Sequence, residues 1–150
     1  MEREEPSVWK SIFQHPEGTL AFGKSLMPSI EAEMTRSGID QSVLVAFPWQ
    51  NPSNCTLNNE HLLDLINQKP DKFFAICSVN PFKPGWQEEL ERSKKKGAIG
   101  IKINPQWQEG CLSSEAVESL AHQCAASNLL IMTHIDHPYK NSGASPAHFC

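Results

Sequence analysis

Residues 98–105, Ala98-Ile99-Gly100-Ile101-Lys102-Ile103-Asn104-Pro105, alternate between branched apolar side chains and small or polar ones. Successive side chains of a strand point to opposite faces, so the three isoleucines share one face and Gly100, Lys102 and Asn104 share the other. The pattern therefore predicts a β-strand over 98–105 whose isoleucine face packs against helices.

Three further apolar runs bounded by turn residues predict strands over 42–48, 73–81 and 129–136. The runs that begin at Ser42 and Phe73 are nearly continuous in apolar residues, which is typical of a parallel sheet covered on both faces. Capping and stop residues predict a helix before each strand: over 28–37, from Asn58 or Asn59 to Pro70, over about 85–96, and from Ser113 or Ser114 to Asn128. Helix and strand thus alternate four times, as βαβ units require.

Two architectures accept such a series: an open doubly wound sheet and a closed eight-stranded barrel. A glycine-rich phosphate loop after the first strand would favour the open sheet, but Phe47-Pro48-Trp49-Gln50-Asn51-Pro52 stands there instead. This absence favours the barrel, which would make the chain an α/β fold, a partial (β/α)8 TIM barrel with about four parallel strands, because a full barrel needs ~250 residues. The barrel portion is expected over 28–140, with a poorly defined segment at 1–27 and a mobile tail at 141–150.

Charge and composition exclude several functions. The net charge of -4 gives no attraction for nucleic acid or an anionic membrane. No apolar stretch approaches the ~18 residues of a membrane span, and the acidic opening Met1-Glu2-Arg3-Glu4-Glu5 is unlike a secretory signal. Five cysteines, an odd number without a C-x-x-C pair, indicate reduced thiols rather than disulfides or a zinc ribbon. We expect a cytoplasmic protein.

Lys102 is the first candidate for chemistry. In a barrel it points inward near the carboxyl end of its strand, where barrel enzymes build their active sites. A lysine is costly to desolvate there without a partner or a task. The alternative is a lysine whose ammonium group reaches solvent at the barrel mouth, as a salt-bridge partner.

The run Leu130-Ile131-Met132-Thr133-His134 ends a predicted strand on an imidazole, the commonest metal ligand. Alternation places Asp136 on the same side as His134, and His137 follows at once. A hydrogen-bonded histidine that caps a strand is the alternative. Catalytic zinc takes three protein ligands, so His134 would need two further donors.

Substrate contacts are expected from residues near the ends of these strands. Trp49 follows the first strand, and an aromatic ring at a barrel mouth can line a pocket for a flat or apolar substrate. Asn104, beyond Lys102 on the same face, and His137 are the other candidates. Core packing is the alternative for Trp49.

Four motifs, in order, resemble the amidohydrolase-related family. They are Met34-x-x-x-Gly38-Ile39-Asp40, then Pro70-Asp71-Lys72-Phe73-Phe74 leading to Val79-Asn80-Pro81, then Gly97-x-x-Gly100-Ile101-Lys102-Ile103-Asn104-Pro105, and finally Ile131-x-Thr133-His134. The resemblance covers about 28–137 and implies a metal-binding barrel that hydrolyses C–N or C–O bonds or decarboxylates aromatic and unsaturated acids.

The resemblance also implies roles for single residues. His134 matches the metal-binding histidine that ends the fifth strand of the family's barrel, and Lys102 lies on the preceding strand, where some relatives use a lysine. The family's His-x-His pair has no counterpart in this chain. We therefore expect strands two to five of a metal-dependent hydrolase or decarboxylase barrel, inactive by itself, that holds a divalent metal, zinc by preference, and a small-molecule substrate only when the barrel is complete. The alternative is a non-catalytic half-barrel that buries its sheet edges against another copy or another chain.

Overall fold

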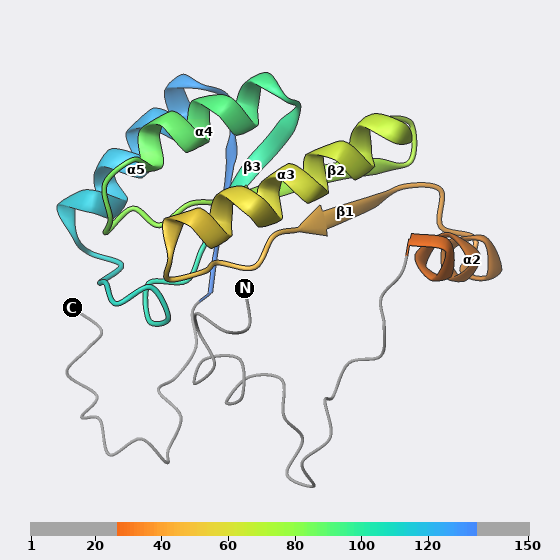
Figure 1. Cartoon of the computed structure of the whole chain (residues 1–150), viewed down its shortest axis with the longest axis horizontal. Coiled ribbons are helices and arrows are strands. Elements are labelled where there is room, and N and C mark those ends of the chain that lie inside the picture. Colours follow the sequence, from red (N-terminus) through yellow and green to blue (C-terminus); the bar gives the residue numbers. More distant parts are fainter. Residues whose placement is uncertain (1–26, 135–150) are drawn as a thin grey trace, which may run out of the picture. The chain divides into compact units, whose positions relative to one another are not determined.

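The computed structural model describes residues 27–134, in which helices and strands alternate as predicted (Figure 1). The elements are α2 (Met27–Ser37), β1 (Ser42–Val45), α3 (Pro52–Gln68), β2 (Phe73–Ser78), α4 (Trp86–Lys95), β3 (Ala98–Ile103), α5 (Glu115–Ala126) and β4 (Leu130–Thr133). The chain divides into two compact units between Ser42 and Val43, and α2 belongs to the first unit. Among the described helices, none is long and apolar enough to cross a membrane.

The order of the strands selects the barrel architecture. The parallel sheet runs β1-β2-β3-β4, so neighbours in the sheet are also neighbours in the sequence. A doubly wound sheet reverses its strand order at a switch point, whereas a barrel adds strands in sequence. Helices α3, α4 and α5 all lie along one side of this sheet (Figure 1). The predicted partial TIM barrel is therefore confirmed as a half-barrel of four parallel strands.

The core lies between the sheet and these three helices. Ile101 and its register partner Cys77 are completely buried, as is Ile103 two residues further along β3. The Cys77 thiol meets Ser93 of α4, which shows that this face is the one the helices cover. The most buried side chains on the helices are Leu63, Leu90 and Leu120. The isoleucines at 101 and 103 therefore pack as the alternation predicted.

The predicted start of α3 is wrong. The helix begins at Pro52, with Asn51 as its N-cap accepting a hydrogen bond from the Ser53 N–H at 2.9 Å. Pro at the first helical position loses no hydrogen bond, so Asn51-Pro52 is a strong start signal. Asn58 and Asn59, the predicted caps, lie inside the helix and use their side chains to hold neighbouring segments.

The predicted starts of the two later helices are closer to the structure. Ser114 caps α5 and accepts from the Val117 N–H. Gly85 precedes α4 as its N-cap. Gly97 follows α4 with φ of 102°, a left-handed conformation that favours glycine over residues with a Cβ.

Each strand ends two or three residues earlier than predicted, at Val45, Ser78, Ile103 and Thr133. The described residues that were assigned to the strand ends lie outside the sheet, at 46–48, 79–81, 104–105 and 134. The expectation of a sheet covered on both faces is also wrong for β1, where Val43 and Val45 are exposed.

A half-buried carboxylate joins α3 to α4. Glu89 accepts hydrogen bonds from Thr56 Oγ1 at 3.0 Å, from Asn59 Nδ2 at 2.7 Å and from the Arg92 guanidinium at 2.7 and 2.9 Å. Burial by itself would raise the pKa of Glu89, but the hydrogen bonds from Arg92 and Asn59 outweigh it and leave that pKa below its ordinary value. The two helices are thus held together by a charged group that stays ionised.

Candidate functional site

The carboxyl ends of parallel strands meet at one end of the sheet, and the loops that leave β1, β2 and β3 gather there. We call this end the mouth: it comprises residues 46–51, 79–85 and 104–114 together with His134. Polar contacts between these loops, rather than apolar packing alone, determine its shape.

Gln108 joins three of these loops. Its side chain is completely buried, and its Nε2 donates to the Trp49 carbonyl at 3.2 Å and to the Val79 carbonyl at 2.8 Å. Its Oε1 accepts from the Asn104 backbone N–H at 2.9 Å. One side chain thereby satisfies backbone groups after β1, β2 and β3, which would otherwise be buried without partners. No sequence pattern indicates this role, because Gln108 stands in a loop outside every motif.

Asn80 performs a similar task on β2. Its Nδ2 donates to the Gln50 carbonyl at 2.7 Å, and its Oδ1 accepts from the Phe82 N–H at 3.0 Å. Asn80 and Asn104 are both buried, and each precedes a proline just after a strand. This repeated Asn-Pro pair was the sequence signal that could have identified the residues lining the mouth.

Asn59 reaches from α3 to the end of β2. Its Nδ2 donates to the Ser78 carbonyl and its Oδ1 accepts from the Ser78 N–H, both at 2.7 Å. The Ser78 hydroxyl in turn donates to the Phe47 carbonyl at 2.8 Å. The start of the loop after β1 is therefore fixed against β2 by side chains.

A row of aromatic rings crosses the mouth. The ring centroids of Phe47 and Trp49 are 4.6 Å apart, and Phe47 stacks on Trp107 at 5.2 Å. Trp107 stacks in turn on the His134 imidazole at 5.8 Å. The row extends from the loop after β1 to the end of β4. Such ring pairs contribute about 0.5–1.5 kcal/mol beyond the area they bury, so Trp107 helps to orient His134.

Lys102 is half-buried on β3, in register with Ser78 of β2 and Met132 of β4. Desolvation by its surroundings lowers the pKa of its ammonium group. Within residues 27–134 the structure shows no carboxylate paired with Lys102. The catalytic role predicted for Lys102 stays a prediction.

The other predicted site residues differ in burial, and two of them lie outside the described residues. Asn104 is buried, and its Nδ2 finds no hydrogen-bond partner in the described part of the chain. Trp49 is also buried, and its carbonyl accepts from Gln108 and from the Cys55 thiol. His134 lies directly after β4 and is exposed. Asp136 and His137 lie outside the described residues.

The described residues do not by themselves form a metal site. From 27 to 134 there is no group of three or more His, Cys, Asp or Glu side chains that could hold an ion. His134 therefore brings one imidazole to the mouth, whereas a catalytic zinc takes three protein ligands. The two other metal ligands would have to come from outside the described residues.

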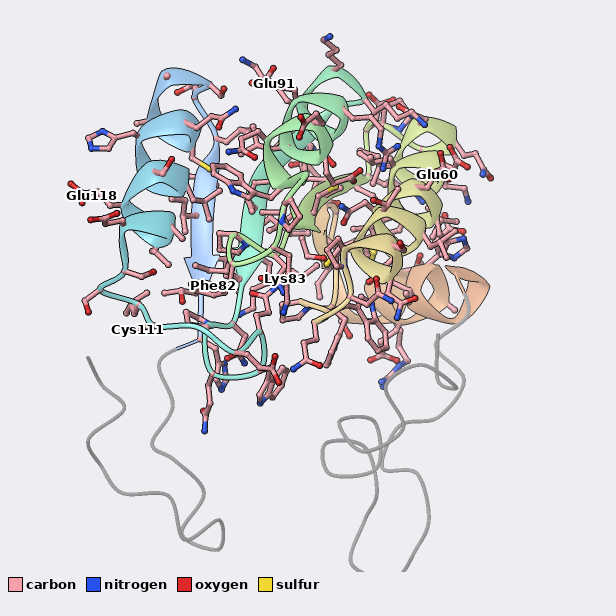
Figure 2. The ribbon with its side chains drawn as sticks, turned by 60° about the vertical axis from the view of Figure 1, so that its left-hand side comes forward. Glu60, Phe82, Lys83, Glu91, Cys111 and Glu118 are labelled. Carbon is pink, nitrogen blue, oxygen red and sulfur yellow. The ribbon has the colours of Figure 1, made fainter. Side chains whose placement is uncertain are left out.

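The loop after β3 packs closely on the loop after β2. A Cβ at Gly110 would overlap the ring of Phe82, so glycine permits the contact. Lys83 forms an ion pair with Glu109 at 3.9 Å across the same contact. Figure 2 shows Phe82, Lys83 and Cys111 together at this end of the molecule, whereas Glu60, Glu91 and Glu118 lie on α3, α4 and α5.

Comparison with solved structures finds similar folds among complete barrels. A 5-carboxyvanillate decarboxylase from Novosphingobium aromaticivorans, complexed with manganese and a nitrobenzoic acid, matches 85% of this chain with a TM-score of 0.64 and 22% identity. A 2,6-dihydroxybenzoate decarboxylase from Rhizobium matches 79% with a TM-score of 0.66 and 17% identity. A protein described as an amidohydrolase matches 94% with a TM-score of 0.68 and 17% identity.

These matches cover 40%, 42% and 50% of the respective chains, so this chain spans half or less of their length. No protein-family model matches the sequence, and neither does any curated protein. At these identities the likeness shows the fold: part of a TIM barrel like those of amidohydrolase-family decarboxylases and hydratases. The fold implied by the sequence resemblance is confirmed.

Proposed function

We propose that this chain supplies one side of the active-site mouth of a metal-dependent hydrolase or decarboxylase barrel that acts on a small molecule. The observation that carries the proposal is the row of rings ending at His134, at the same end of the sheet as Lys102 and Asn104. Stacked rings bury a flat or apolar substrate, and a few polar groups at the pocket fix its orientation.

In this proposal, Lys102 and Asn104 bind the polar part of the substrate. A desolvated ammonium group gains from an anionic partner, and a buried amide Nδ2 gains from any acceptor, because each otherwise bears the cost of burial without a compensating bond. Lys102 thus acts as a catalytic residue beside a carboxylate or carbonyl oxygen, while Phe47 and Trp107 stack against the apolar part. Trp49, being buried, supports Phe47 from behind.

His134 is the proposed metal ligand in the completed site, where a divalent ion would supply Lewis acidity and an activated water. Zinc follows from the family resemblance, and manganese is present in the decarboxylase from Novosphingobium aromaticivorans. Asp136 is proposed as a second catalytic residue and His137 as a substrate contact. The site requires donors beyond the described residues.

Metal binding tests this function. The full chain is loaded with zinc or manganese, desalted and analysed by elemental mass spectrometry, beside His134→Ala and the control His122→Ala. His122 is an exposed histidine on α5, away from the mouth. In the completed barrel we expect bound metal that His134→Ala loses and His122→Ala keeps. Absence of metal from the wild-type chain, or equal loss in both variants, would contradict the proposal.

A second candidate function is a non-catalytic half-barrel that serves as an assembly or binding unit. It is favoured by the mouth, where His134 is the one histidine among the described residues, and by the apolar residues exposed on β1 and β4. The same metal measurement separates the two functions, because an assembly unit has no need of His134.

A further inference from the structure

The apolar residues left in solvent concentrate at the two outer strands of the sheet. Among the large hydrophobic residues that the structure describes, those exposed on strands all belong to β1 or β4: Val43, Val45, Leu130, Ile131 and Met132. Leu130 is 61% exposed and Val43 48%. The inner strands β2 and β3 expose no large hydrophobic residue. The apolar side chains of the inner strands are therefore covered, whereas those of the two outer strands are left in solvent.

Each edge also leaves backbone hydrogen-bonding groups without a strand partner. In the described sheet, β1 has β2 beside it and β4 has β3, and neither has a second neighbour. Unpaired N–H and C=O groups beside apolar side chains are a template for another strand. These edges carry none of the features that usually block such pairing, since no proline or charged side chain lies within Ser42–Val45 or Leu130–Thr133.

The edges of two such sheets match each other in the number of strands that they bring together and in the direction of those strands. A closed barrel of this type has eight parallel strands, and residues 27–134 of this chain supply four. A two-fold rotation about an axis along the strands leaves every strand parallel to the rest and places β4 of one copy beside β1 of the other. The rotation creates two identical seams and leaves no open edge. The complete barrels matched above are also two or more times as long as the matched part.

We propose that two copies of this chain close one eight-stranded barrel, with β4 of each copy paired in parallel with β1 of the other. The inference rests on the half-barrel of the proposed function and names its missing half as a second copy. Because the rotation axis runs along the strands, the carboxyl ends of both copies face the same mouth. Lys102, Asn104 and His134 of each copy then line one pocket from opposite sides.

The oligomeric state in solution is the first test. Sedimentation equilibrium of the full chain should give twice the 16.8 kDa mass of the monomer, with no larger species, because the closed barrel has no free edge. Val45→Lys and Met132→Lys place a charge in the seam and should weaken dimerisation at least about tenfold. The control is Leu57→Lys, because Leu57 is an exposed leucine on α3 that lies outside the seam.

Circular dichroism of each variant shows whether the monomer remains folded. A monomeric wild-type chain would overturn the inference. So would a dimer that survives both seam substitutions while the protein stays folded.

Cross-linking identifies the pairing. In a background where Cys111 and Cys150 are replaced by serine, Val45→Cys and Met132→Cys are prepared separately and treated with a bismaleimide too short to reach across a barrel. We expect a cross-linked dimer only when the two variants are mixed, because β1 meets β4 of the other copy. Cross-links within either variant alone would show β1–β1 or β4–β4 pairing and overturn the inference.

The outcomes for closure and for function are distinguishable. A cross-linked dimer that binds no metal supports the closed barrel and contradicts the enzyme proposal. A monomer that binds metal through His134 supports the enzyme proposal and contradicts the closed barrel.

Discussion

Gln108 offers the sharpest test of the structure, because one buried side chain satisfies three backbone groups from three loops. Gln108→Leu keeps a similar size but removes all three hydrogen bonds. Each bond contributes roughly 0.5–1.5 kcal/mol net, so the free energy of unfolding should fall by about 3 kcal/mol. That is a large part of the roughly 5–15 kcal/mol that stabilises a domain.

Gln108→Glu separates hydrogen bonding from packing. One carboxylate oxygen can still accept from the Asn104 N–H, but the other faces the Trp49 and Val79 carbonyls, which are acceptors. The buried carboxyl should therefore have a raised pKa and remain protonated, donating to one of those carbonyls. A carboxyl group whose pKa is raised in the folded state stabilises the fold at a pH below its unfolded-state pKa, which is near 4.3 for Glu. That contribution is lost as the pH rises through the folded-state pKa.

Urea unfolding of wild type, Gln108→Glu and the control Gln106→Glu, measured from pH 4 to pH 8, tests this reasoning. Gln106 is exposed two residues away, so its substitution should change stability by less than about 0.5 kcal/mol at every pH. The deficit of Gln108→Glu should grow with pH. A pH-independent deficit equal to that of the control would refute the placement of Gln108 between the three loops.

Three further predictions concern the supporting structure. Glu89→Gln should lower the free energy of unfolding by about 2 kcal/mol at neutral pH. The pKa of Glu89 is lower in the folded state than in the unfolded state, so its ionised form stabilises the fold above the unfolded pKa and this contribution is lost as pH falls. The deficit of the variant against wild type should therefore shrink below pH 4, and urea unfolding measures both effects. Burial raises the pKa of the Cys77 and Cys124 thiols to about 11, so iodoacetamide at pH 8 should label half-buried Cys111 first and those two only after unfolding, as read by peptide mass mapping. Asn51→Ala removes the α3 cap and should cost about 1 kcal/mol in thermal unfolding, whereas Asn67→Ala, exposed near the end of the same helix, should cost less.

The architecture was readable from the sequence because its signals are local. Alternation over 98–105 placed Ile101 and Ile103 on the face covered by helices, and Ser114 marked the start of α5. Strand ends were harder to predict, because Phe47 and Val79 continue the apolar runs and Asn104 continues the alternation, while the backbone of all three bonds to side chains.

The polar contacts of the mouth could not be predicted in the same way. Gln108 lies 59 residues from Trp49, and no local pattern reports a bond at that separation. The start of α3 was misassigned for a related reason: Asn58 and Asn59 are good capping residues by type, yet their amides bond to Phe47 and Ser78. A short polar side chain indicates that a hydrogen bond forms, but the tertiary structure determines its partner.

The bond between Asn59 and Ser78 has a consequence for how the mouth opens. A side-chain amide that both donates to and accepts from one residue imitates the peptide unit of an adjoining strand, so Asn59 stands in for β1 where that strand has already left the sheet. The chain can then leave the sheet after Ala46, which still donates to the Ile76 carbonyl, while the backbone of Ser78 keeps its hydrogen bonds. The path of the loop after β1 thus depends on two amides of α3, since Asn58 accepts from the Phe47 N–H while Asn59 holds Ser78.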